Sequence, residues 1–253
     1  MENHTAVLKK IKDISKGLSI FTFKINPKFD FKPGQWLTLA YQEGDNKILR
    51  PYSIASSPSQ MPDIELFVRL INFKNKFGKF TSKLFKAKIG EKFGIIKIGG
   101  KFLLEEDKRK KIMISSGTGL APYISMIRNQ IENNSKCDFI VIHGVSYEND
   151  LSYREELEKY EKEEKIIKYI PAISRPEENK NWKGEVGRAE KLVISGRLSK
   201  ILNESLDPKK YVFYLCGHPH MIEDINEYLK TIGFKEKEDI KFEKYWSSPR
   251  PKV

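Results

Sequence analysis

The stretch IMISSGTGLAP, residues 112–122, decides how the second half of this chain folds. An apolar strand, Ile112–Ile114, runs into a turn with two glycines, and a helical stretch, Ala121–Glu132, follows. Glycines let a ligand come close to the backbone, and a helix N-terminus favours negative charge. The turn lacks the three glycines of the dinucleotide fingerprint. Its place predicts a ligand site at the carboxyl end of the first strand of an α/β unit.

Beyond this stretch, apolar strands alternate with helical segments, which predicts βαβ units and a parallel sheet. The expected strands are Asp138–Ile142, Ile166–Ile170, Tyr211–Leu215 and Ile240–Lys244. The expected helices are Tyr153–Glu164, Ala189–Ser195 and Met221–Thr231.

Before it, the first hundred residues alternate with a period near two, and turn signals such as Pro33-Gly34 separate the segments. This pattern predicts an antiparallel barrel or sandwich, with one short helix at Thr81–Lys88. The expected strands are Ser19–Ile25, Gln35–Tyr41, Asp63–Ile71 and Phe93–Ile98. We therefore expect two domains, 1–106 and 107–253.

The composition excludes several classes of protein. The chain has 253 residues, 39% of them hydrophobic, which is too apolar for disorder. Its two cysteines, Cys137 and Cys216, form neither a disulfide framework nor a metal motif, so we expect no metal site and a cytoplasmic protein. No signal peptide or membrane-spanning stretch is apparent. The net charge of +12 could suit nucleic acid, but no nucleic-acid motif supports that reading.

Two further motifs lie in strand contexts. Arg50–Ser56 reads RPYSIAS: arginine suits a phosphate and a tyrosine ring suits stacking on a flat heterocycle. Alternation places Arg50 and Tyr52 on one side of a strand and Ser53 on the other, although an ordinary edge strand would look similar. CGHPHM, starting at Cys216, follows a strand, and here the cysteine could equally be a buried filler.

The chain then ends on FEKYW, residues 242–246, and seven further residues. Taken in order, RPYS, GTGLAP, CGHPHM and the terminal YW resemble the ferredoxin–NADP⁺ reductase family, and most closely its bacterial ferredoxin (flavodoxin) reductases. The resemblance implies an antiparallel β-barrel FAD-binding domain followed by an α/β parallel-sheet NADP-binding domain, with FAD between them. It also implies an enzyme that passes electrons between NADPH, which gives a hydride, and an acidic ferredoxin or flavodoxin, which takes one electron at a time.

The resemblance assigns roles to individual residues around the flavin. Arg50 would pair with its pyrophosphate or ribityl region, Tyr52 would stack on its rings, and Ser53 would lie near its reactive nitrogen. The backbone at the helix start and the Thr81 hydroxyl would hold a phosphate. The FAD-binding residues expected are Arg50, Pro51, Tyr52, Ser53, Leu66, Phe67, Val68, Arg69, Gly78, Lys79, Phe80, Thr81, Thr118, Tyr245 and Trp246.

For the nucleotide, the resemblance implies that Cys216 helps orient the nicotinamide. The resemblance favours NADPH over NADH. However, Ser146 stands where the family commonly has an arginine, so the 2′-phosphate site has one cation fewer, and Lys180 or Lys183 could supply the missing charge. Glu243 is a candidate proton relay or a solvent-facing carboxylate. The NADP-binding residues expected are Gly119, Val145, Ser146, Ser174, Arg175, Arg188, Cys216 and Gly217.

Alternative functions within reach are an NADH-dependent flavin reductase, an electron-transfer subunit of a larger oxidoreductase, and a flavin-binding module without turnover. We expect a monomer. Residues 1–106 hold 19 Lys and Arg against 10 Asp and Glu, whereas residues 107–253 hold 27 against 24. The excess charge therefore favours a docking surface for an acidic redox protein on the first domain. Its lysines are Lys74, Lys76, Lys79, Lys83, Lys86 and Lys88.

Overall fold

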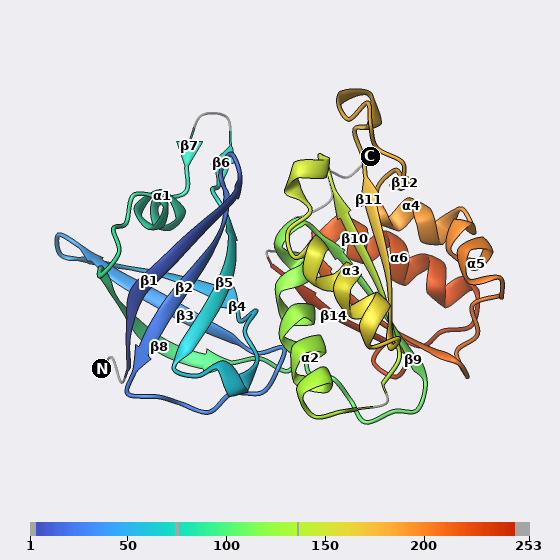
Figure 1. Ribbon diagram of the computed structural model, residues 1–253, viewed down its shortest axis with the longest axis horizontal. Helices are drawn as coiled ribbons and strands as arrows, with labels where there is room; N and C mark the ends of the chain where they lie inside the picture. The colour runs from blue at the N-terminus through green and yellow to red at the C-terminus, as the bar shows by residue number, and fades with distance from the viewer. Residues whose placement is uncertain (1–3, 74–75, 136, 246–253) are drawn as a thin grey trace. The chain divides into compact units, whose positions relative to one another are not determined.

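The chain is folded into two compact units (Figure 1). This computed structural model describes residues 4–73, 76–135 and 137–245. One unit comprises Met1–Glu105 and Ala121–Asn134, and the other comprises Glu106–Leu120 and Ser135–Val253. No helix among the described residues is long and apolar enough to cross a membrane.

The first unit is built on one antiparallel sheet with the strand order β4-β3-β8-β1-β2-β5. Beyond the end of β4, Ile54 forms a bridge to Leu66 of β5, and the Ala55 N–H donates to the Glu65 carbonyl at 2.9 Å. The two edges of the sheet meet there, so the sheet is a barrel rather than a sandwich. The strands are β1 (His4–Ser15), β2 (Leu18–Asn26), β3 (Trp36–Glu43), β4 (Asn46–Ser53), β5 (Asp63–Arg69) and β8 (Lys92–Gly99).

Alternating side chains of these strands fill the barrel core. The short helix α1 (Lys79–Phe85) adds Phe80, which is 1% exposed. The Phe80 ring centroid lies 5.3 Å from that of Tyr41 and 5.7 Å from that of Tyr52. Packing of α1 therefore fixes the strand that carries the RPYS motif. A two-stranded hairpin, β6 (Asn72–Phe73) and β7 (Lys76–Phe77), precedes α1.

Helix α2 (Ala121–Glu132) belongs to this first unit although it follows β9 in the chain. Its inner residues are buried, and polar contacts attach it to the barrel. The Ser125 hydroxyl donates to the Ser56 carbonyl at 2.6 Å, and Arg128 pairs with Glu65 at 2.7 Å. The helix that the sequence assigned to the α/β half thus packs with the barrel.

The second unit contains a parallel sheet with the order β12-β11-β10-β9-β13-β14. Helices α4, α5 and α6 cover the face that carries Ile112, Ile142 and Phe213, as a common core shows. The strands are β9 (Lys110–Ser116), β10 (Phe139–Val145), β11 (Ile167–Ile173), β12 (Glu185–Val186), β13 (Tyr211–Gly217) and β14 (Ile240–Lys244). The helices are α3 (Arg154–Glu163), α4 (Ala189–Ile194), α5 (Arg197–Leu202) and α6 (Pro219–Thr231).

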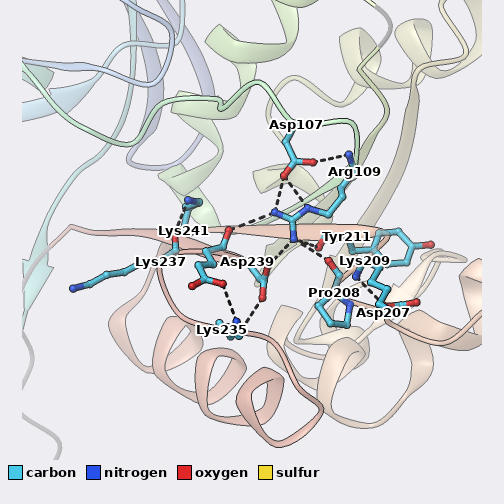
Figure 2. A network of polar contacts seen from close by, with 11 residues as sticks. Asp107, Arg109, Asp207, Pro208, Lys209, Tyr211, Lys235, Lys237, Asp239 and Lys241 are labelled. Atoms are coloured by element: carbon cyan, nitrogen blue, oxygen red, sulfur yellow. Dashed lines mark hydrogen bonds and ion pairs between the residues drawn. The ribbon is translucent and has the colours of Figure 1, made fainter.

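A polar network joins the amino ends of β9, β13 and β14 (Figure 2). Arg109 donates to the Asp107 carboxylate at 2.8 Å, to the Asp239 carboxylate at 2.6 Å and to the Pro208 carbonyl at 2.8 Å. The side chain of Lys111 is buried beside them and donates to the Arg109 carbonyl at 2.7 Å. Three segments far apart in sequence are thereby held at one edge, opposite the edge where ligands bind in such sheets.

The expected fold class, a barrel followed by a parallel α/β sheet, is confirmed. In the parallel sheet four strands extend beyond their expected ends, because β9, β10, β11 and β13 continue to Ser116, Val145, Ile173 and Gly217. The pattern gave no expectation for β1, β6, β7, β12 or α5, and α1 begins two residues earlier than Thr81. Because of these extensions, predicted ligand-binding residues such as Val145, Cys216 and Gly217 lie at the ends of strands.

Candidate functional site

Two glycine-containing turns meet at the carboxyl edge of the parallel sheet. A Cβ on Gly119, after β9, would lie 2.3 Å from the Cys216 carbonyl oxygen at the end of β13. A Cβ on Gly217, whose φ is +127°, would lie 2.5 Å from the Ser116 hydroxyl. That hydroxyl accepts the His218 N–H at 2.9 Å. Only glycine fits both positions, because the two buried turns pack directly against each other.

Cys216 itself lies beside these turns and is fully buried. Burial raises the pKa of its thiol well above the ordinary range, the Glu243 carboxylate raises it further, and a hydrogen bond with Tyr245 lowers it. The side chain is therefore a neutral thiol and not a nucleophile. Glu243 stands opposite Cys216 in the β13–β14 register and is half-buried.

The carboxyl-terminal aromatic Tyr245 reaches the same place. Its phenol donates to the Thr118 carbonyl in the Gly-rich turn at 2.8 Å. Thr118, Cys216 and Tyr245, which the sequence predicted separately, thus form one cluster with the glycines. Trp246 and the tail Ser247–Val253 lie outside the described residues.

His143, which the sequence analysis did not single out, contacts the backbone of the Gly-rich turn. It lies near the end of β10, fully buried, with Nε2 3.1 Å from the Gly117 carbonyl. Burial lowers the pKa of His143 to about 4, so the ring is neutral at neutral pH and can donate this hydrogen bond. The sequence signal that could have pointed to this residue is a histidine within the otherwise apolar strand β10.

The loops after β10 and β11 carry the residues expected at the 2′-phosphate. The Arg175 guanidinium donates to the Tyr147 hydroxyl, with its Cζ 5.2 Å from the Tyr147 ring centroid. The Glu178 carboxylate lies 3.4 Å from the same guanidinium. Ser146 and Ser174 are half-buried at the start of these loops. Tyr147 and Glu178 were not predicted.

The other expected cations, Arg188, Lys180 and Lys183, also belong to the second unit. Arg188 is exposed at the N-cap of α4, and its charge contributes to lowering the pKa of His218. Lys180 is exposed. Lys183 lines an open pocket of about 440 Å³ together with Lys191 and Arg197. Val145, also predicted at the nucleotide, is buried in a small apolar cluster, so only its backbone is available to a ligand.

In the first unit, the RPYS motif occupies β4. The register pairs Arg50 with Leu39 and Tyr52 with Leu37, so Arg50 and Tyr52 share a face and Ser53 takes the other, as alternation predicted. Arg50 is exposed, and Ser53 is 7% exposed. Pro51 lacks an N–H and is tolerated because β4 ends the hydrogen-bonded strand order.

Tyr52 offers a direct test of whether a cofactor fits. Its ring packs on Phe80, and its hydroxyl oxygen is buried with no hydrogen-bond partner among the residues that the structure describes. Burial raises the pKa of this phenol. An unpaired buried hydroxyl costs about 1–3 kcal/mol. A bound cofactor that bonds this hydroxyl would remove that cost, so the residues present fit FAD.

The start of α1 was expected to hold a phosphate. The Thr81 hydroxyl accepts the Ile71 N–H and donates to the Gly78 carbonyl, both at 3.2 Å, so it fixes the turn. In the described part of the chain no side chain caps α1, so its first backbone N–H groups, after Gly78, receive no side-chain acceptor. The side chain of Phe80 is committed to the core, and Lys79 is exposed 3.6 Å from Glu43.

The strand β5 divides the predicted flavin contacts by face. Leu66 and Val68 are buried in the barrel core. Phe67 and Arg69 alternate with them, and Phe67 is 4% exposed while Arg69 is half-buried. Among these four residues only Arg69 has a partly exposed side chain, and the side chains of Leu66, Phe67 and Val68 are buried.

An antiparallel barrel followed by a parallel sheet, with two glycine-containing turns packed together at the carboxyl edge of that sheet, is the fold expected of a flavin- and pyridine-nucleotide-dependent oxidoreductase. Residues 5–102 match the model of the oxidoreductase FAD-binding domain, and residues 113–227 match that of the oxidoreductase NAD-binding domain.

Known proteins extend this comparison to most of the chain. It is 30% identical over 233 residues to the flavodoxin/ferredoxin–NADP reductase of Buchnera aphidicola subsp. Baizongia pistaciae, covering 89% of each protein. It is 28% identical over 233 residues to the ferredoxin–NADP reductase of Pseudomonas aeruginosa, covering 86% of each. The chain belongs to the ferredoxin–NADP reductase family.

The fold agrees with this membership. A crystal structure of a ferredoxin NADP⁺ reductase from Neisseria gonorrhoeae with bound FAD and NADP superimposes with a TM-score of 0.83. That comparison has 24% sequence identity and covers 96% of this chain and 98% of the other. The chain is therefore an oxidoreductase with an FAD-binding and an NAD(P)-binding domain.

Proposed function

We propose that this protein is a ferredoxin or flavodoxin–NADP⁺ reductase, which moves electrons between NADPH and a small one-electron carrier. The meeting of Gly119, Cys216 and Tyr245 at the carboxyl edge of the sheet carries the proposal. There a buried, neutral thiol and an aromatic side chain lie beside the Gly-rich turn, at the edge where α/β sheets bind ligands. The names of the two curated relatives support the choice of partner.

In this proposal the domain of residues 1–106 binds FAD and the domain of residues 107–253 binds the nucleotide. FAD, when bound, exchanges a hydride with nicotinamide and single electrons with a protein partner. Arg50 neutralises the cofactor's phosphate charge, the Tyr52 hydroxyl gains its missing partner, and the N–H groups at the start of α1 bind the second phosphate. Ser53 donates or accepts a hydrogen bond beside the reacting nitrogen.

On the nucleotide side, the nicotinamide lies at the edge that the packed turns of Gly119 and Gly217 form, and Cys216 orients it as a neutral neighbour. Arg175 and Arg188 bind the 2′-phosphate. Glu243 lies opposite Cys216, and its proposed role of moving a proton to the site rests on that position alone. Tyr52 and Tyr245 are proposed to shield the flavin rings from water, which the transfer of a hydride requires.

The partner is proposed to dock on lysines around α1, where opposite charge would steer it. Lys79 lies near Glu43 and Lys83 is paired with Glu91, whereas Lys86 makes no ion pair with any described residue. Lys74 and the side chain of Lys76 lie outside the described part of the chain. Lys86, exposed at the C-cap of α1, is therefore available to meet an acidic surface.

The alternative is an NADH-dependent flavin reductase. It is favoured by Ser146, which supplies no positive charge, and by the carboxylate of Glu178 beside Arg175. Both features weaken the attraction for a 2′-phosphate.

Anaerobic reduction of the FAD-loaded protein with NADPH and NADH, side by side, tests the proposal. We expect NADPH to bleach the flavin at the lower concentration, and the reduced protein then to reduce ferredoxin or flavodoxin. Faster reduction by NADH, with electrons passed only to free flavin, would favour the flavin reductase. No bleaching by either nucleotide would leave a flavin-binding module without turnover.

A further inference from the structure

Hydrogen bonds connect the loop that follows β10 to the loop that follows β11. Asn179 donates to the Arg175 carbonyl at 2.6 Å and accepts the Glu148 N–H at 2.9 Å. The Ser174 N–H donates to the Val145 carbonyl at 2.9 Å. These bonds fix the backbone of Arg175, so the position of its guanidinium depends on what its side chain touches.

Among the described residues, two side chains touch that guanidinium. Tyr147 stacks against it and accepts its hydrogen bond, which holds the planar group in place. Glu178 lies three residues further along and contacts the same nitrogen of Arg175 at 3.4 Å. About half of the Arg175 and Glu178 side chains is exposed, 52% and 51%, so an entering anion can replace the carboxylate.

We propose that Tyr147 and Glu178 set the preference between 2′-phosphorylated and unphosphorylated nucleotides through Arg175. Tyr147 is a positioning residue that holds the guanidinium ready for a phosphate. Glu178 is an internal competitor, which the 2′-phosphate must displace. This inference rests on the proposed function, because it takes the carboxyl edge of the sheet as the nucleotide site.

The chemistry of the two nucleotides makes the effect selective. A guanidinium binds a phosphate through paired hydrogen bonds, whereas the 2′-hydroxyl of NADH carries no charge and has no need to displace Glu178. Exposed ion pairs change binding by about two- to fivefold. Since Ser146 adds no second cation beside this pair, we expect Glu178 to lower the preference for NADPH by that factor.

The first experiment compares 2′,5′-ADP with 5′-AMP by calorimetric binding to the FAD-loaded protein. Glu178→Gln should bind 2′,5′-ADP about two- to fivefold more tightly and leave 5′-AMP unchanged. The matched control is Glu177→Gln, which removes the same charge from an exposed neighbour that makes no contact with Arg175 among the described residues. The gain in Glu178→Gln should exceed that in Glu177→Gln and fade with added salt.

The second experiment changes the stacking partner. Tyr147→Phe keeps the ring and should weaken 2′,5′-ADP by roughly twofold, and Tyr147→Leu, which also loses the stack, by roughly fivefold. Binding of 5′-AMP should stay constant in both. Equal effects of Glu178→Gln and Glu177→Gln, or equal weakening of both ligands in Tyr147→Leu, would overturn the inference alone. Failure of the unmodified protein to bind either ligand would overturn the proposed function and the inference with it.

Discussion

The Gly119 backbone packs directly against the Cys216 carbonyl, so closely that a Cβ would lie 2.3 Å from that oxygen. Real Cβ atoms do not come so near, and the oxygen belongs to the backbone of a buried strand that cannot move aside. The turn after β9 and the end of β13 are therefore held at a distance that only glycine permits.

Gly119→Ala should push these two turns apart. We expect a loss of about 1–3 kcal/mol in unfolding free energy and a flavin reduction by NADPH at least tenfold slower. Urea unfolding and stopped-flow absorbance measure the two effects. Gly117→Ala is the matched control, because a Cβ there meets nothing within 4 Å and strains only the backbone at φ +54°. Equal losses of activity in the two variants would show that the close approach is not the cause.

Arg109 should stabilise the opposite edge of the sheet. Arg109→Met leaves the largely buried Asp239 carboxylate without its guanidinium partner, and we expect about 2–3 kcal/mol lower stability. Thermal and urea unfolding test this. Arg197→Met breaks an exposed pair with Glu185 and should change stability far less. Comparable losses in both variants would contradict a special role for the Arg109 network.

His143 should make the protein sensitive to acid. Its folded pKa is near 4 and its ordinary value is 6.5, so the unfolded chain binds more protons between these limits. The neutral ring makes its full contribution to the free energy of unfolding above pH 6.5, and this contribution falls as the pH drops toward 4. From pH 7 to pH 5 we expect a loss of about 2 kcal/mol. His143→Gln, which keeps a donor for Gly117, should lose less over this interval in urea unfolding, and an unchanged pH slope would argue against burial of a neutral ring.

Ser53 should act on the transfer step. Ser53→Ala removes one hydroxyl at the end of β4, and loss of one hydrogen bond at the reacting nitrogen should slow flavin reduction roughly tenfold. The NADPH dissociation constant should stay within about twofold, since the hydroxyl does not lie in the nucleotide domain. Stopped-flow traces at several NADPH concentrations separate the two quantities. Unchanged transfer would remove Ser53 from the mechanism.

Lys86 should affect only the protein partner. Lys86→Glu should slow reduction of ferredoxin or flavodoxin about tenfold at low salt and leave flavin reduction by NADPH unchanged. Added salt should slow partner reduction in the unmodified protein and reduce the difference between variants. Lys209→Glu carries the same charge change on an exposed loop of the second unit. If it slows partner reduction as much as Lys86→Glu does, net charge rather than docking on α1 explains the effect.

Local patterns predicted much of this fold. Alternation put Arg50 and Tyr52 on one face of β4, and the apolar run before Gly117 became the central strand β9. These features depend on neighbours in sequence, because strand pleating and turn chemistry act over a few residues. The order of the four motifs also predicted the family.

Contacts between distant segments escaped prediction. Nothing near Arg175 in sequence indicates that Tyr147, 28 residues earlier, holds its guanidinium. His143 reads as an ordinary residue of a buried strand until the fold brings Gly117 to its Nε2. Helix α2 follows a strand of the parallel sheet, yet its polar contacts are with the barrel.

The sequence by itself therefore determined the two kinds of unit and their order, because these follow from local periodicity, and the motifs it carries predict the candidate ligand-binding residues. Only the tertiary structure decided which of those residues meet. It closed the barrel through Ile54 and Leu66, set Gly119 against Cys216, and paired Arg175 with both Tyr147 and Glu178. The reason is that such contacts arise when whole elements pack, and packing depends on shape complementarity across the chain.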